Sequence, residues 1–176
     1  MIKSVKQQGI NKMGDCGQCC LAGITGKSVK EIYDSQERID GLSYFTMLSL
    51  IKKLGLIYDN KLPHLDDWRK KDGNEEWQTF GLPSYILSYE WLQNGYTKIK
   101  CGWIGLCLIN FSGNAIDDEF ADHWVIVNNI KFNNEGLYND DNVFISCPNR
   151  GEYSINVKKF LKYYGGYNAI WIKIDH

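Results

Sequence analysis

The hydrophobic pattern of this 176-residue chain changes period part-way along its length. In the first half, apolar residues recur at the three- and four-residue spacing of helices that bury one face. From about residue 104 they form short runs rich in β-branched residues, which is typical of buried strands. Consecutive runs are joined by loops rather than by helical crossovers, and this favours antiparallel pairing. The sequence therefore predicts an α+β fold with N-terminal helices packed on a C-terminal antiparallel β-sheet.

Capping and stop signals place the helices. Ser28 and Glu31 form a capping box, in which each side chain accepts a hydrogen bond from the other residue's backbone amide. Gly26 and Gly55 are the expected stops of the helices before them. The expected helices are Cys16–Ile24, a short one from Ser28 to about Asp34, one capped by Ser43 with Phe45, Leu48, Ile51 and Leu54 on its apolar face, Pro83–Asn94 with Gly95 beyond its end, and Val157–Tyr164.

Four apolar runs are predicted to form the sheet. They are Ile104–Phe111, His123–Val127, Val143–Cys147 and Asn168–Ile174. Residues 59–80 are polar and carry several charges, so they are predicted to form a loop or an insertion.

Size and composition limit the class of protein. A chain of 176 residues can bury a proper core in one domain, so residues 1–176 are expected to form a single domain. Hydrophobic residues make up 44% and charged residues 23%, and these values are close to globular averages. The formal net charge of −1 provides no general attraction to nucleic acid or to anionic lipid, so neither is expected as a partner.

The N-terminal residues and the cysteines bear on the compartment. Basic residues near the start are not followed by an apolar segment, so no signal peptide is predicted, and no run of apolar residues is long enough to span a bilayer. We therefore expect a cytoplasmic protein that does not enter the membrane. In that reducing compartment the six cysteines are expected to be thiols rather than disulfides.

Cys16 is the first candidate for chemistry because it stands at the predicted start of a helix. A helix N-terminus offers unpaired amides and a partial positive charge, and both lower the pKa of a thiol. Gly17 removes a side chain from beside the sulfur, which is expected to let a substrate carbonyl approach. A small buried apolar residue is the ordinary role of a cysteine, so position alone does not decide between the two roles.

His123 is the best-placed base among the three histidines. It opens an apolar strand after an acidic loop, whereas His176 is terminal and His64 lies in a polar segment. Acyl transfer by a cysteine requires such a base, because imidazole takes the thiol proton and then returns a proton to the leaving group. A cysteine–histidine pair of this kind also requires donors for the oxyanion, and Gln7 or Gln8 could supply a side-chain amide.

These segments resemble the C39 and C39-like papain-fold cysteine peptidases. The resemblance begins with Val5–Gln8 and Gly14–Ile32, which match a glutamine, then Asp-Cys-Gly leading a helix of small residues, then Gly-x-Ser and a second helix. His123–Val127 is similar to the histidine strand of the family, Val143–Tyr153 to the strand and turn that follow, and Val157–Phe160 to the closing helix. The resemblance covers both ends of the chain and leaves residues 56–100 unmatched.

The resemblance implies a papain-like fold in which Cys16 is the nucleophile, His123 is the base and Gln8 is the nearer candidate for the oxyanion donor. The glutamine is further from the cysteine than in the usual pattern. The family has an aspartate before a proline where this chain has Cys147. Asn149 is therefore expected to hold the second ring nitrogen, as asparagine does in papain-like enzymes, with Cys147 as the alternative.

The predicted activity is that of a cysteine-dependent hydrolase that acts on a peptide or protein substrate without a cofactor. A Cys–His acyl or glutamine transferase shares the first step and differs only in the acceptor. A catalytically weak peptide-binding module of the same fold is a further alternative. Residues 59–80 and 112–121 are the loops expected to shape the substrate groove.

The spacing Cys16-x-x-Cys19 also occurs in zinc sites and in redox motifs. A structural zinc site requires a second matched pair, and Cys101 and Cys107 are six residues apart in a strand-like run. A thioredoxin-like motif requires a preceding strand in a βαβ frame, which the sequence does not indicate. We therefore expect no bound metal.

Overall fold

The structure is a computed structural model, and it describes residues 2, 5–6, 14–36, 41–59, 89–110, 122–133, 141–164 and 169–174. The helices of the described part are α1 (Cys16–Thr25), α2 (Val29–Asp34), α3 (Tyr44–Lys53), α5 (Tyr89–Lys100) and α6 (Val157–Tyr164). The strands are β1 (Tyr58–Asp59), β2 (Trp103–Asn110), β3 (Asp122–Lys131), β4 (Asn142–Cys147), β5 (Gly151–Asn156) and β6 (Ala169–Lys173).

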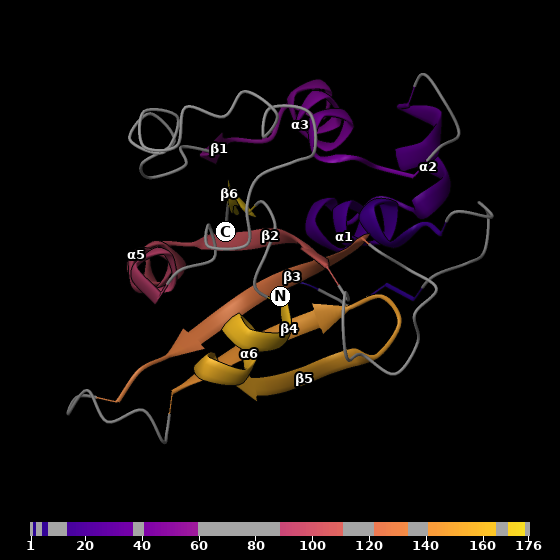
Figure 1. Cartoon of the computed structure of the whole chain (residues 1–176). Helices are drawn as coiled ribbons and strands as arrows, with labels where there is room; N and C mark the ends of the chain where they lie inside the picture. Colours follow the sequence, from indigo (N-terminus) through magenta and orange to yellow (C-terminus); the bar gives the residue numbers. More distant parts are fainter. Residues whose placement is uncertain are drawn as a thin grey trace, which may run out of the picture.

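The strands form one antiparallel sheet in the order β1-β6-β2-β3-β4-β5. Side chains alternate between its two faces, and each face is covered by its own apolar cluster. The first cluster joins α1, α2 and α3 to one face, and the second joins α5 and α6 to the other. Figure 1 shows α1, α2 and α3 grouped together and α6 in front of β4 and β5. The predicted α+β class is confirmed.

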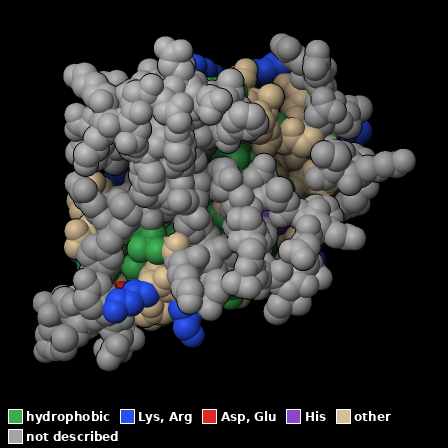
Figure 2. All heavy atoms as spheres, viewed as in Figure 1, with side chains coloured by type: hydrophobic (Ala, Val, Ile, Leu, Met, Phe, Trp, Pro, Cys, Tyr) green, Lys and Arg blue, Asp and Glu red, His purple; other side chains and the backbone are tan. Residues whose placement is uncertain are grey.

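Most charged side chains lie on the outside of the described part, and apolar side chains lie between its layers. Figure 2 shows lysine and arginine side chains around the margin of the visible face, and apolar side chains appear further in. No helix in the described ranges is long and apolar enough to cross a membrane.

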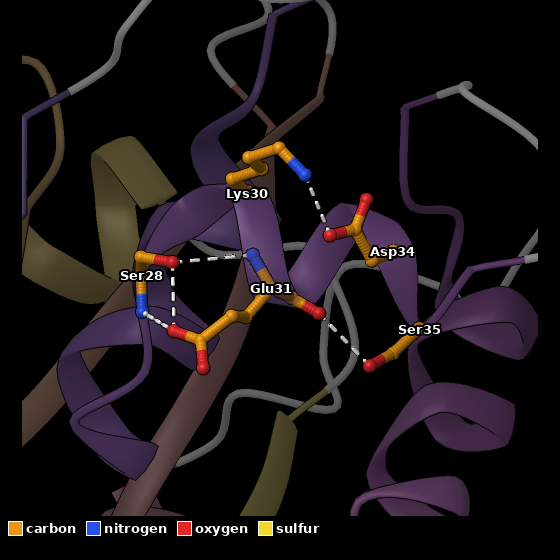
Figure 3. Close-up of polar contacts among 5 residues, drawn as sticks. All are labelled: Ser28, Lys30, Glu31, Asp34 and Ser35. Atoms are coloured by element: carbon orange, nitrogen blue, oxygen red, sulfur yellow. Dashed lines mark hydrogen bonds and ion pairs between the residues drawn. The ribbon is translucent and has the colours of Figure 1, made fainter.

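Local capping signals fixed the first helices as predicted. Gly26 ends α1 in the left-handed conformation with φ of 73°. The Ser28 hydroxyl accepts from the Glu31 amide at 3.2 Å, and the Glu31 carboxylate accepts from the Ser28 amide at 2.8 Å (Figure 3). One turn along α2, Lys30 forms an exposed ion pair with Asp34. The predicted capping box is therefore confirmed.

The apolar face of α3 is rotated from the predicted one. Ser43 caps the helix as expected and accepts from the Thr46 amide. The buried stripe is Met47, Leu50 and Ile51, whereas Phe45 is 79% exposed. The expectation that Phe45 packs inward is wrong, because a stripe that starts at Met47 continues through Leu50, Ile51 and Leu54 at ideal helical spacing and leaves Phe45 outside it.

The helix expected over Pro83–Asn94 is described from Tyr89, where α5 begins, and residues 83–88 lie outside the described residues. The prediction that Gly95 lies beyond its end is wrong, because α5 continues through Gly95 to Lys100. A Cβ atom at Gly95 would lie 2.2 Å from the ring of Trp171 on β6. The glycine makes room for a distant indole and does not stop the helix.

Two strands were not predicted. β1 has only two residues and pairs with β6 at one edge of the sheet. β5 pairs with β4 at the other edge and alternates half-buried and exposed residues. The four predicted strands correspond to β2, β3, β4 and β6, and the predicted helix Val157–Tyr164 is α6.

Candidate functional site

Cys16 is the first residue of α1, as the sequence predicts. Its Sγ accepts a hydrogen bond from the backbone N–H of Trp124 at 3.4 Å. Trp124 follows His123 directly near the start of β3, and α1 packs against that strand (Figure 1). The structure therefore brings the candidate nucleophile to the strand position next to the candidate base, although the two are 107 residues apart in the chain.

Trp124 links three parts of the chain at this point. Besides its amide contact with Cys16, its carbonyl oxygen accepts from the Cys20 thiol at 3.5 Å. Its indole Nε1–H donates to the carbonyl of Leu42 at 2.6 Å. The side chain is 1% exposed. The sequence alone indicates no role for Trp124, because a tryptophan in an apolar run is typical of a buried core residue.

Gly17 has a packing role that differs from the predicted one. A Cβ atom at this position would lie 3.0 Å from side-chain atoms of Leu42, Met47 and Trp124. Core side chains therefore occupy the space beside Gly17 that a side chain would need. The glycine does not open a path for substrate. Gly17 allows the indole to lie directly against the first turn of the helix.

We expect Gly17→Ala to lower the free energy of unfolding by about 1–3 kcal/mol, because the added methyl overpacks three buried neighbours. Urea denaturation of the two proteins measures the difference. Gly26→Ala provides a comparison at an exposed glycine whose cost comes from its left-handed backbone rather than from packing. A Gly17→Ala variant as stable as the wild type would contradict the packing role.

The imidazole of His123 lies beside a thiol of the neighbouring strand. Its Nε2 lies 3.2 Å from the Sγ of Cys147 on β4. The two side chains are 3% and 1% exposed. Antiparallel pairing of β3 with β4 places Ile126 opposite Ser146, and alternation then puts His123 and Cys147 on the same face of the sheet. A buried cysteine–histidine pair is therefore a property of this fold.

The structure describes both candidates for the residue that orients His123, Asn149 and Cys147. Asn149 belongs to the turn over residues 148–150, and its side chain is exposed. Cys147, the alternative to Asn149, is the residue that the structure places beside the ring. Gln7 and Gln8 lie outside the described residues, so the proposed oxyanion donor stays a prediction.

Burial sets the protonation of the Cys16 thiol and of the His123 imidazole. It raises the pKa of the Cys16 thiol, and the N–H groups of Trp124 and Gly17 only partly offset this effect. The expectation that the helix start depresses this pKa is therefore wrong, because burial outweighs the amides and Asp15 adds a further raising effect. Burial, together with the positive charge of Arg150, lowers the pKa of His123 to about 4. At neutral pH the resting site holds a neutral thiol and a neutral imidazole.

The lowered pKa of His123 makes stability depend on pH. Between pH 6.5 and 4 the unfolded chain binds a proton at this residue and the folded chain does not, so stability falls as the pH falls through this window. The difference corresponds to about 3 kcal/mol when fully developed. Urea denaturation from pH 7 to 4 should show this loss in the wild type and a shallower loss in His123→Gln, which does not titrate. Equal slopes would contradict a buried neutral imidazole.

The six cysteines are thiols, as predicted. Among the residues that the structure describes, no three His, Cys, Asp or Glu side chains are arranged to hold a metal ion. Only Cys101 is exposed, Cys16 is intermediate, and the remaining four are buried. Cys101 is therefore the thiol that will compete with Cys16 for any reagent.

Comparisons with models of known protein families and with curated proteins give no match to this chain. The candidate site is therefore defined by its geometry and by the motifs in the sequence.

Proposed function

We propose that this protein is a cysteine hydrolase that cleaves peptide or isopeptide bonds through an acyl-enzyme, with Cys16 as nucleophile and His123 as base. The observation that carries the proposal is the hydrogen bond from the Trp124 amide to the Cys16 sulfur. It joins a thiol at a helix start to the residue that follows a buried imidazole. The sequence motifs around these residues resemble those of the C39-like peptidases, and we propose that the chain is a divergent relative of them.

The two nitrogens of His123 have different roles in this proposal. Nε2 faces Cys147, so Nδ1 is the nitrogen that takes the proton from Cys16. Because the resting pair is neutral, the proton moves to Nδ1 as the sulfur attacks the substrate carbonyl carbon. The imidazolium then gives this proton to the leaving amine, and water hydrolyses the thioester in the reverse sequence of proton transfers.

The start of α1 supplies part of the stabilisation of the oxyanion. Amides of the first helical turn have no intrahelical acceptor, and they carry the positive end of the helix dipole. The Gly17 amide interacts with the Cys16 sulfur, and in this proposal it donates to the oxyanion that forms on the attacked carbon. A side-chain donor from Gln8 would complete the oxyanion hole.

Acyl transfer from peptide p-nitrophenyl esters tests this proposal. The experiment uses a Cys101→Ser background, which removes the exposed thiol. We expect one acyl group on the Cys16 peptide by mass spectrometry, followed by release of the free acid at a rate above that of the buffer. An amide product formed with an added amine would indicate transfer instead of hydrolysis. Acylation that is absent, or that is confined to other cysteines, would contradict the proposal.

A further inference from the structure

Both backbone hydrogen-bonding groups of Trp124 contact thiols of α1. The N–H donates to Cys16 Sγ at 3.4 Å, and the carbonyl accepts from Cys20 Sγ at 3.5 Å. In an antiparallel strand the N–H and C=O of one residue point to the same side. The pairing of β3 with β4 runs from Ile126 to Lys131, so Trp124 lies beyond its end. At this point the thiols of Cys16 and Cys20 take the hydrogen-bonding positions that a neighbouring strand would fill.

The helical spacing of the two cysteines matches this contact. Cys16 and Cys20 are four residues apart, so their side chains lie on one face of α1, one turn above the other. A single hydrogen bond would not by itself define the rotation of α1 about β3. Two contacts, to the two ends of one residue, fix both the rotation of the helix and its position along its axis.

Water cannot take the place of the Cys20 thiol as a donor to the Trp124 carbonyl, because both residues are buried. Cys20 and Trp124 are each 1% exposed, so loss of the thiol would leave a buried carbonyl without this donor. Trp124 is anchored independently of α1 through its indole bond to Leu42. The strand is therefore the fixed part, and Cys20 holds the helix to it.

We infer that Cys20 is a positioning residue, which holds α1 in register with β3 so that the sulfur of Cys16 stays at the Trp124 amide, one residue after His123. The expected effect of Cys20 on catalysis rests on the proposed function. The expected effect of Cys20 on the reactivity of the Cys16 thiol does not. Burial raises the pKa of Cys20 well above its ordinary value, so the thiol keeps its proton and remains a donor across the neutral range.

A second buried cysteine provides a control that distinguishes a positioning role of Cys20 from a packing role. Cys107 on β2 is 0% exposed and belongs to the apolar cluster on the opposite face from α1. Cys107→Ala and Cys20→Ala remove the same sulfur from equally buried sites. A core role alone predicts similar effects of the two changes on Cys16.

The test compares Cys20→Ala, Cys20→Ser and Cys107→Ala in the Cys101→Ser background. The first readout is the rate of iodoacetamide labelling of Cys16 at pH 8, followed by mass spectrometry. Burial is the largest cause of the raised pKa of Cys16, so release of the helix should lower that pKa. We expect Cys20→Ala to increase labelling about threefold to tenfold, the range that corresponds to loss of one hydrogen bond.

The second readout is turnover of the acyl substrate. Cys20→Ala should lower it about tenfold to a hundredfold, because a displaced nucleophile loses its attack geometry. The hydroxyl of Cys20→Ser should restore both readouts towards the wild type, and Cys107→Ala should leave both within about twofold. If Cys20→Ala does not fold, Cys20→Val and Cys20→Thr, which are equal in size and differ in a hydroxyl donor, provide the same comparison.

Faster labelling together with slower turnover would support the inference. Equal effects of Cys20→Ala and Cys107→Ala on labelling, or a Cys20→Ser variant that behaves like alanine, would overturn it. An absence of acyl turnover in the unmutated protein would instead contradict the proposed function, and the labelling comparison would still decide the role of Cys20.

Discussion

Cys16→Ala is expected to lower the turnover of an acyl substrate by about four to six powers of ten, which is the scale of losses when a nucleophile that acts as a unit with its base is removed. Without the sulfur no thioester forms, and His123 can act only on water. The measurement is release of p-nitrophenol and of the free acid under saturating substrate. Mass spectrometry of the same samples should show no acyl group on the α1 peptide.

Cys19→Ala is the matched control for this result. Cys19 lies one turn along the same helix and is buried, and its thiol donates to the carbonyl of Lys6 rather than to β3. Its loss removes a small core side chain, so turnover should stay within about tenfold of the wild type while stability falls by about 1 kcal/mol. Equal losses of turnover in the two variants would show that α1 is required for folding and would leave Cys16 without a chemical role.

Local sequence signals predicted the helices whose ends they mark. The capping box at Ser28 and the stop at Gly26 act over a few residues, so the sequence alone could place them. Gly95 misled the prediction because its cause is the ring of Trp171, which comes from a strand 76 residues later. β5 was missed because an edge strand buries little and its alternation is weak.

The positions of the two main candidate residues in the fold were also predictable. Cys16 and His123 were assigned from their positions at the start of a helix and of a strand, and the structure places both of these residues there. The direction of the pKa shift of Cys16 was not predictable, because it depends on how deeply the folded chain covers the sulfur. The choice between Cys147 and Asn149 depends on how β4 pairs with β3, and spacing along the chain does not determine that register.

Cys147→Ala is expected to lower turnover by about one to three powers of ten. The estimate is scaled down from the loss that follows when the acidic partner of a catalytic histidine is changed. Neutral imidazole has two tautomers, and only the one with its proton on Nε2 leaves Nδ1 able to accept from Cys16. At 3.2 Å the sulfur of Cys147 can accept a hydrogen bond from the Nε2–H group, and burial of both side chains excludes competing water. Without the sulfur the ring can rotate and can exchange tautomers.

Cys147→Asp tests the same contact by strengthening the acceptor beside Nε2 instead of removing it. A carboxylate beside Nε2 stabilises the imidazolium, so the pKa of His123 should rise from about 4 by about 1 to 3 pH units. Titration of the His123 ring protons by NMR measures this change, with His123→Gln used to assign the signal among the three histidines. Asn149→Ala provides the control, because its exposed side chain lies in the turn, and we expect it to change turnover less than twofold. If Asn149→Ala lowers turnover and Cys147→Ala does not, then Asn149 orients the ring during catalysis, and the turn over residues 148–150 must move to bring its amide to Nε2.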